Sequence, residues 1–144
     1  LIANAAITTA KIGNNMVTFP QASIGSGYID LNVASGQVTL SSLTATRSGA
    51  PAQIDASSFV STVSGGTTGY GVFDYYLYRN GSLVSGFNNS RVQGQNAFTA
   101  TIFYSDTQSS TTTYLLKAQV TSVVGGLTNV RFLIPSITFV ELKR

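Results

Sequence analysis

The chain contains no cysteine and no histidine, and only 9% of its 144 residues are charged. Without cysteine there can be no disulfide framework, no thiolate nucleophile and no cysteine-ligated metal. The absence of histidine removes the commonest catalytic base and the commonest metal ligand. Together these absences exclude much ordinary enzyme chemistry, and we expect no metal site and no cofactor.

Small polar residues take the place of the missing charges, since the chain has 18 Ser, 18 Thr, 14 Gly and 9 Asn. Hydrophobic residues still make up 43% of the sequence and include 7 Tyr and 8 Phe, which is enough for a packed interior and excludes disorder for most of the chain. No apolar run approaches the roughly 18 residues of a transmembrane helix. A length of 144 residues is typical of a single domain.

The basic residues are scattered, although they outnumber the acidic ones by 8 to 5 and give a net charge of +3. Only Lys143 and Arg144 are adjacent in the sequence. A nucleic-acid interface needs basic residues clustered on one face, often with aromatic residues between them. We therefore expect no nucleic-acid partner.

The first 24 residues differ in pattern from the rest. Ile2, Ile7, Ile12 and Val17 recur at a spacing of five, which matches neither the period of about 3.6 of an α-helix nor the period of about 2 of a β-strand. A single segment cannot gather these side chains on one face, so the segment is either an irregular linker or a repeat that packs against other chains. The sequence thus predicts an extended segment over residues 1–24 and a domain over residues 25–144.

The domain shows β character throughout. Asn80-Gly81 is the strongest hairpin signal, because both central residues of a type I′ turn need a positive φ. No segment has a helical period, and turn residues recur along the whole domain. These features predict an all-β fold, an antiparallel β-sandwich or jelly roll. The expected strands are residues 28–34, 37–46 (with an irregularity near residues 41–42), 54–60, 70–79, 82–87, 97–105, 112–124, 127–134 and 136–142.

Several expected strands are apolar on both faces. In residues 71–79, Phe73 and Leu77 point one way while Tyr76 and Tyr78 point the other. One face can line a core, but a second face of this kind would be an unusually large apolar patch if it were exposed. Contact between subunits would cover it. The alternative is an amphipathic outer surface, because tyrosine tolerates a half-wet boundary.

The acidic residues are spread along the chain, and no two of them lie within fifteen residues of each other. A glycosidase needs two carboxylates about 5 to 9 Å apart, so the fold would have to assemble such a pair. Asp74 and Glu141 are the best candidates, although an isolated strand carboxylate equally fits an exposed or arginine-paired structural residue. Without histidine there is no Ser-His-Asp triad, and no Gly-x-Ser-x-Gly elbow occurs. We expect a protein that is not an enzyme.

The remaining signal is a surface suited to recognition. We expect long loops over residues 61–71, 85–96 and 105–111. Binding loops favour tyrosine, serine, glycine and asparagine, which supply rigid aromatic area and adaptable hydrogen bonds, although loops in general are rich in the same small polar residues. The candidate receptor-binding residues are Tyr70, Phe87, Asn88, Asn89, Arg91 and Gln93.

Both ends of the chain carry patterns of one known family. Residues 5–13 (AAITTAKIG) resemble the repeated stem units of phage tail fibres and of the host-specificity (central tail-tip fibre) proteins of lambda-like phages. Residues 131–144, which end in ELKR, resemble the final strand of such fibre heads. Residues 106–118, with DT ahead of TYLLKA, are similar to the hairpin just upstream of that strand. The order of the three patterns agrees with this family.

The resemblance implies the C-terminal tip of a tail-tip protein whose remaining part precedes this fragment. Three copies would wind together through residues 1–24 as a stem and carry three β-sandwich heads at the fibre tip of a virion tail. This homotrimer would bind a bacterial cell-surface receptor (an outer-membrane protein, a pilus or a polysaccharide) and mediate host adhesion without catalysis. The alternative is a monomeric carbohydrate-binding or Ig-like module, tethered by residues 1–24 to a larger secreted enzyme or surface protein.

Overall fold

The structure is a computed structural model that describes residues 20–64 and 67–142. Within these residues the chain forms nine β-strands and one short 3₁₀ helix, and none of its helices is both long and apolar enough to cross a membrane. The elements are β1 (Gln21–Ile24), β2 (Tyr28–Leu31), η2 (Val33–Ser35), β3 (Gln37–Ala45), β4 (Ala52–Val63), β5 (Tyr70–Arg79), β6 (Ser82–Gln93), β7 (Phe98–Asp106), β8 (Thr112–Val124) and β9 (Asn129–Glu141).

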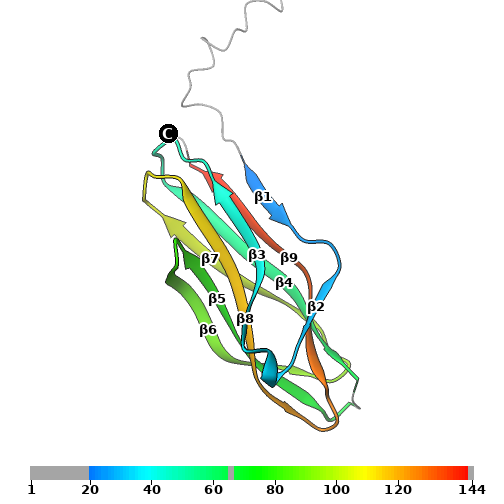
Figure 1. The fold of residues 1–144 in the computed structure, drawn as a ribbon. Helices are drawn as coiled ribbons and strands as arrows, with labels where there is room; N and C mark the ends of the chain where they lie inside the picture. The colour runs from blue at the N-terminus through cyan, green and yellow to red at the C-terminus, as the bar shows by residue number, and fades with distance from the viewer. Residues whose placement is uncertain (1–19, 65–66, 143–144) are drawn as a thin grey trace, which may run out of the picture.

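The strands form two sheets that face each other (Figure 1). In sheet A the order is β1-β9-β4-β7, and β2 also pairs with β9. In sheet B the order is β3-β8-β5-β6. Every strand pairing in the described residues is antiparallel. The predicted all-β sandwich is confirmed.

The core lies between the two sheets. Along β5, Phe73, Tyr75 and Leu77 are fully buried while the residues between them face outward, which confirms the alternation predicted for this strand. Phe73 meets Phe132 of sheet A edge to face, with 5.4 Å between the ring centroids. Because the inward side chains of both sheets are used in this core, each sheet presents one outward face to the surroundings.

The predicted hairpin at Asn80-Gly81 joins β5 to β6. Asn80 has a φ of 46° and Gly81 a φ of 83°, as a type I′ turn requires. The turn is also tied to β8, because the backbone N–H of Thr113 donates to Oδ1 of Asn80 at 2.8 Å. This turn sets the register that places the outward residues of β5 beside those of β6.

Strand β9 contains Pro135, which the sequence placed between two separate strands. The proline falls between residues 130–133, which pair with β2, and residues 136–139, which pair with β1. Its missing N–H therefore interrupts neither of these ladders. Ile134 absorbs the irregularity with a φ of 46°.

Two further predictions differ in detail from the structure. The irregularity expected near residues 41–42 is a register shift between Thr39 and Ser41. Strand β1 pairs with residues 136–139 in sheet A, so the predicted boundary at residue 24 falls inside the sandwich. Residues 1–19 of the predicted stem lie outside the described residues.

Candidate functional site

The candidate receptor-binding residues all lie on sheet B. Tyr70 begins β5, and the other five lie on β6, which is an edge strand. The prediction of a loop over residues 85–96 is wrong, because β6 pairs with β5 from Ser82 to Gln93. The asparagines that indicated a loop are accommodated by a register irregularity in the edge strand, and the glycine is paired regularly with Tyr76.

Phe87 points into the core. Its ring stacks on Tyr75 with 5.3 Å between centroids and meets Phe73 edge to face at 6.2 Å. The side chain thus packs against the buried cluster between the sheets. Phe87 is partly buried and stabilises the sandwich, so most of its ring is packed against the core and only part of it faces solvent.

Tyr70, Arg91 and Gln93 meet at one end of sheet B. The guanidinium carbon of Arg91 lies 3.5 Å from the centroid of the Tyr70 ring. Gln93 is the register partner of Tyr70, and its amide nitrogen lies 3.5 Å from the carbonyl oxygen of Thr67. The structure therefore brings these three predicted residues together, with one face of the Tyr70 ring covered by Arg91.

Asn88 and Asn89 occupy a bulge in β6. The bulge shows as a register shift against β5 between Phe73 and Tyr75, and Asn89 adopts a φ of 57°, a left-handed conformation that asparagine tolerates. The backbone N–H of Asn89 donates to Oδ1 of Asp74 at 2.8 Å. Both asparagine side chains are exposed at the edge of the sheet, and the Asp74 carboxylate holds the bulge that carries them.

Asp74 also holds Tyr76, which sequence reasoning did not identify as a binding residue. The Tyr76 hydroxyl donates to Oδ2 of Asp74 at 3.1 Å, and burial together with this hydrogen bond raises the pKa of Tyr76. Gly86 lies opposite Tyr76 on β6. A Cβ at Gly86 would stand 2.9 Å from Cδ1 of Tyr76 and 2.6 Å from the carbonyl oxygen of Tyr75. The glycine leaves room for the ring beside β6. The sequence carried no direct signal for this pairing, because a hairpin without the register shift after Tyr78 would place Gly86 opposite Tyr75.

Lys117 of β8 lies on the other side of Tyr76, as its register partner. Its ammonium nitrogen stands 4.7 Å from the centroid of the Tyr78 ring, and Nε2 of Gln37 donates to the Tyr78 hydroxyl at 3.2 Å. The rings of Tyr76 and Tyr78 are nearly perpendicular, with centroids 6.4 Å apart. We call the outward surface formed by Asp74, Tyr76, Tyr78, Lys117 and Gln119 the sheet B face.

The outward surface of sheet A is more apolar. The exposed fractions of Ile24, Tyr28, Phe59 and Phe103 are 72%, 58%, 45% and 67%. Tyr28, Leu133 and Phe59 form a row across β2, β9 and β4, because Leu133 is the register partner of the other two. We call the surface formed by these five residues the sheet A face. Several exposed apolar side chains on one side of a sheet are typical of a contact surface.

Asp55 places a carboxylate within the sheet A face. It lies between Phe103 of β7 and Thr138 of β9 in the register of the sheet. Its Oδ1 is buried and has no hydrogen-bond partner among the described residues. Burial raises the pKa of Asp55. A buried carboxylate oxygen without a donor destabilises the fold until a donor reaches it.

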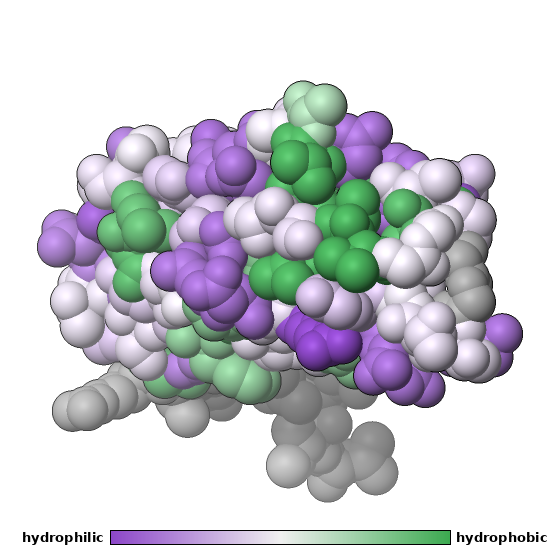
Figure 2. All heavy atoms as spheres, turned by 90° about the horizontal axis from the view of Figure 1, so that it is seen from below, coloured by the Kyte–Doolittle hydropathy of each residue, from purple (hydrophilic) through white to green (hydrophobic). Residues whose placement is uncertain are grey.

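Apolar side chains also gather at the end of the sandwich that carries η2. Figure 2 shows this end, with hydrophobic atoms near its middle and polar atoms around them. Val33 of η2 is half exposed. This end offers contact area, and the opposite end contains a group of buried charged residues.

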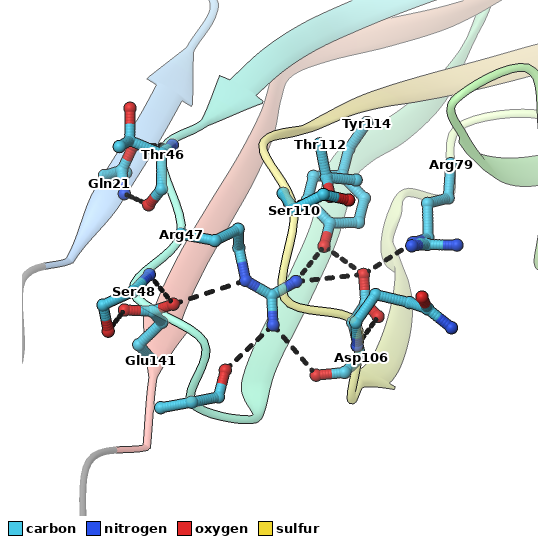
Figure 3. A network of polar contacts seen from close by, with 12 residues as sticks. Gln21, Thr46, Arg47, Ser48, Arg79, Asp106, Ser110, Thr112, Tyr114 and Glu141 are labelled. Carbon is cyan, nitrogen blue, oxygen red and sulfur yellow. Dashed lines mark hydrogen bonds and ion pairs between the residues drawn. The ribbon is translucent and has the colours of Figure 1, made fainter.

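A buried ion network lies at that opposite end and joins both sheets (Figure 3). The fully buried Arg47 lies 3.2 Å from a carboxylate oxygen of Asp106 and 3.3 Å from one of Glu141. Arg79 forms a second ion pair with Asp106 at 2.8 Å. Tyr114 donates a further hydrogen bond to Asp106.

The hydrogen bonds of the network keep both of its carboxylates ionised. Burial alone would raise the pKa of Asp106, but the hydrogen bonds from Tyr114 and Gln108 and the nearby arginines lower it. Burial likewise would raise the pKa of Glu141, which Ser48 and the arginine lower. Ser48 donates to Glu141 through its backbone N–H at 2.8 Å and its hydroxyl at 2.7 Å. Carboxylates held in this way tie strand ends together and are poorly suited to proton transfer.

Asp74 and Glu141, the candidates for a glycosidase pair, do not lie together. Glu141 ends β9 of sheet A inside the ion network, whereas Asp74 faces outward in the middle of sheet B. Asp30 is engaged by Arg131 through two hydrogen bonds, at 2.7 and 2.8 Å. In the part of the chain that the structure describes, no group of three or more acidic residues could hold a metal ion.

Comparison with known proteins supports the fold alone. No protein-family model matches the sequence, and no curated protein matches it. Among solved structures, the VP2 subviral particle of infectious bursal disease virus is similar, with a TM-score of 0.60 and 11% identity over 86% of this chain and 32% of that chain. The structure of the Gt strain of the same virus gives a TM-score of 0.58 and 13% identity over 86% of this chain and 33% of that chain. This chain therefore spans about a third of the length of these two viral chains.

Proposed function

We propose that the chain is a non-enzymatic receptor-binding head that acts as a homotrimer at the tip of a phage tail fibre. The observation that carries the proposal is the sheet A face, because a copy standing alone leaves Ile24, Phe59 and Phe103 in water. The fibre-like patterns at both ends of the sequence support the same assignment. In this arrangement the sheet A face packs against neighbouring copies.

The chemistry of the sheet A face suits contact between like chains. Its exposed side chains are aliphatic or aromatic, and burying such area stabilises an interface by roughly 25 cal/mol per Å². The unpartnered oxygen of Asp55 lies within it, where a donor from a second copy would satisfy it.

The sheet B face is then the surface turned toward the host cell. It carries tyrosines, amides and one charge of each sign, a mixture typical of surfaces that bind by stacking and hydrogen bonds. Three such faces on one rigid fibre raise the avidity by about 10² to 10⁴ over a single site without any new contact. Weak individual sites are therefore sufficient for attachment.

The state of the carboxylates supports binding over catalysis. Asp106 and Glu141 are locked by arginines, and Asp30 is engaged by Arg131. Asp74 accepts hydrogen bonds from two neighbours. A hydrolase would need one of these groups free to exchange protons beside another.

One protein preparation is tested both for its mass in solution and for its attachment to bacterial envelopes. Sedimentation velocity of the 144-residue chain is expected to give three times the monomer mass, and the protein should be pulled down by envelopes of a susceptible bacterium. Envelopes stripped of protein and envelopes stripped of surface glycan identify the class of receptor. A stable monomer at high concentration would contradict the proposed trimer and favour the monomeric tethered module. If the protein is a trimer but binds to no envelope, the proposed role in host adhesion is contradicted.

A further inference from the structure

The centre of the sheet B face is arranged around one aromatic ring. Tyr76 has Gly86 as its register partner on β6 and Lys117 as its register partner on β8. Two residues before Tyr76 on β5, Asp74 is the register partner of Gln119. The ring is thus surrounded, at the level of the sheet, by side chains that donate and accept hydrogen bonds.

The ring of Tyr76 is held in place before any ligand arrives. Gly86 leaves no side chain between the ring and the backbone of β6, and the hydroxyl is fixed to Asp74 at 3.1 Å. The same carboxylate fixes the backbone of Asn89 at 2.8 Å. A ring and a bulge that are ordered in advance lose little conformational entropy on binding.

The polar groups around the ring have unused capacity. Asp74 accepts two hydrogen bonds in the structure, and an ionised carboxylate has about four acceptor sites. Lys117 makes no ion pair with any residue in the described ranges 20–64 and 67–142, and its ammonium group lies over Tyr78. Both side chains can therefore bond a ligand that lies on Tyr76.

The pairing of these groups defines the ligand chemistry. The C–H face of a pyranose ring carries partial positive charge and packs on the negative face of an aromatic ring, while its hydroxyls need donors and acceptors at the rim. Asp74 disfavours a polyanion and Lys117 disfavours a polycation. An uncharged sugar is repelled by neither the carboxylate nor the ammonium group.

We propose that the sheet B face binds a neutral, hexose-containing surface polysaccharide, with one sugar ring stacked on Tyr76. Asp74, Gln119 and Lys117 bond the hydroxyls of that sugar. Asn88 and Asn89 contact the next sugar at the edge of β6. This assignment rests on the proposed function and names its receptor class.

The test is retardation of the 144-residue chain in native gels that contain a neutral polysaccharide. The probes are an α-glucan, a β-glucan, a mannan and a galactan, with polygalacturonate as the charged comparison. At least one neutral probe should retard the protein. Tyr76→Ala should weaken that binding by about tenfold or more, whereas Tyr76→Phe, which keeps the ring, should stay within about threefold.

Val124→Ala is the control, because it removes exposed apolar area from β8, the strand that carries Lys117, at a position six residue pairs from Tyr76, and should leave retardation unchanged. Circular dichroism and sedimentation of each variant confirm that the fold and the mass are retained. Absence of retardation by all neutral probes, or an equal loss in Val124→Ala, would overturn the assignment. If the trimer and envelope binding persist in that case, only the receptor class is wrong. If they are also absent, the proposed function fails with it.

Discussion

The two outer faces of the sandwich are built from the same alternating pattern and differ in what their outward aromatic residues can bond. On the sheet A face, Phe59 and Phe103 have no polar atom, so their exposure is relieved only by another apolar surface. On the sheet B face, Tyr76 and Tyr78 have their hydroxyls bonded to Asp74 and Gln37. A tyrosine whose hydroxyl is bonded and whose ring remains half open is stable in water and still available to a ligand.

A second face that is rich in apolar residues can serve either of two roles. A face of phenylalanine and isoleucine indicates permanent contact, whereas a face of tyrosine with amides and paired charges indicates reversible binding. The alternation of apolar residues does not distinguish the two. The hydroxyls and their partners do.

The first prediction tests the ion network that joins the two sheets. Arg47→Met leaves Asp106 and Glu141 without their shared cation at the end where both sheets meet, and should lower the free energy of unfolding by about 3–5 kcal/mol, as measured by urea denaturation at pH 7. Arg131→Met removes a partly exposed ion pair and should cost about 1 kcal/mol or less. Equal losses in the two variants would contradict a stabilising role for the network.

Acid should weaken the same network. Asp106 and Glu141 have pKa values lowered by folding, so the stability that they contribute is present above their unfolded pKa values, near 4, and is lost as the pH falls through their lower folded values. Unfolding of the parent protein at low pH should therefore be more sensitive to pH than unfolding of Arg47→Met.

The second prediction tests whether the sheet A face, and not sheet B, mediates self-association. Phe59→Asp puts a charge into the middle of the sheet A face and should weaken self-association by on the order of 100-fold, because an unpaired charge would be buried at the interface. Leu83→Asp makes the same change on an exposed side chain of sheet B and should leave the sedimentation profile unchanged. Retention of the trimer by Phe59→Asp would show that sheet A is not the contact surface.

The third prediction concerns a small effect within one face. Asp55 has a pKa raised by burial, so its ionised form destabilises the fold at neutral pH and this cost disappears as acid protonates it. In the Phe59→Asp background, where the sheet A face is left without a partner copy, Asp55→Asn should raise the free energy of unfolding at pH 7 by about 0.5 kcal/mol, with no gain near pH 3. Thermal unfolding at both pH values measures the difference. A gain of equal size at pH 3 would mean that charge is not the cause.

The architecture was predictable from the sequence because period-two alternation and the Asn80-Gly81 turn are local signals. The extent of β6 was not, because Gly86, Asn88 and Asn89 have turn propensity and are drawn into a strand only by pairing with β5. Phe87 lies where the expected strand 82–87 and the expected loop 85–96 overlap, so the sequence did not assign its side chain to the inner or the outer face of a sheet. The Arg47 network joins residues far apart in the chain, so no local pattern indicates it.

The first and last strands of the sandwich are neighbours, with Gln21 opposite Phe139. A pulling force that reaches the head through β1 would by itself peel that strand from β9 one hydrogen bond at a time. The side chain of Gln21 prevents this simple unzipping, because it donates to the carbonyl of Thr46 at 2.9 Å and accepts from its N–H at 3.1 Å (Figure 3). Thr46 directly follows β3 of the other sheet. Mechanical load at this corner is therefore divided between both layers of the sandwich.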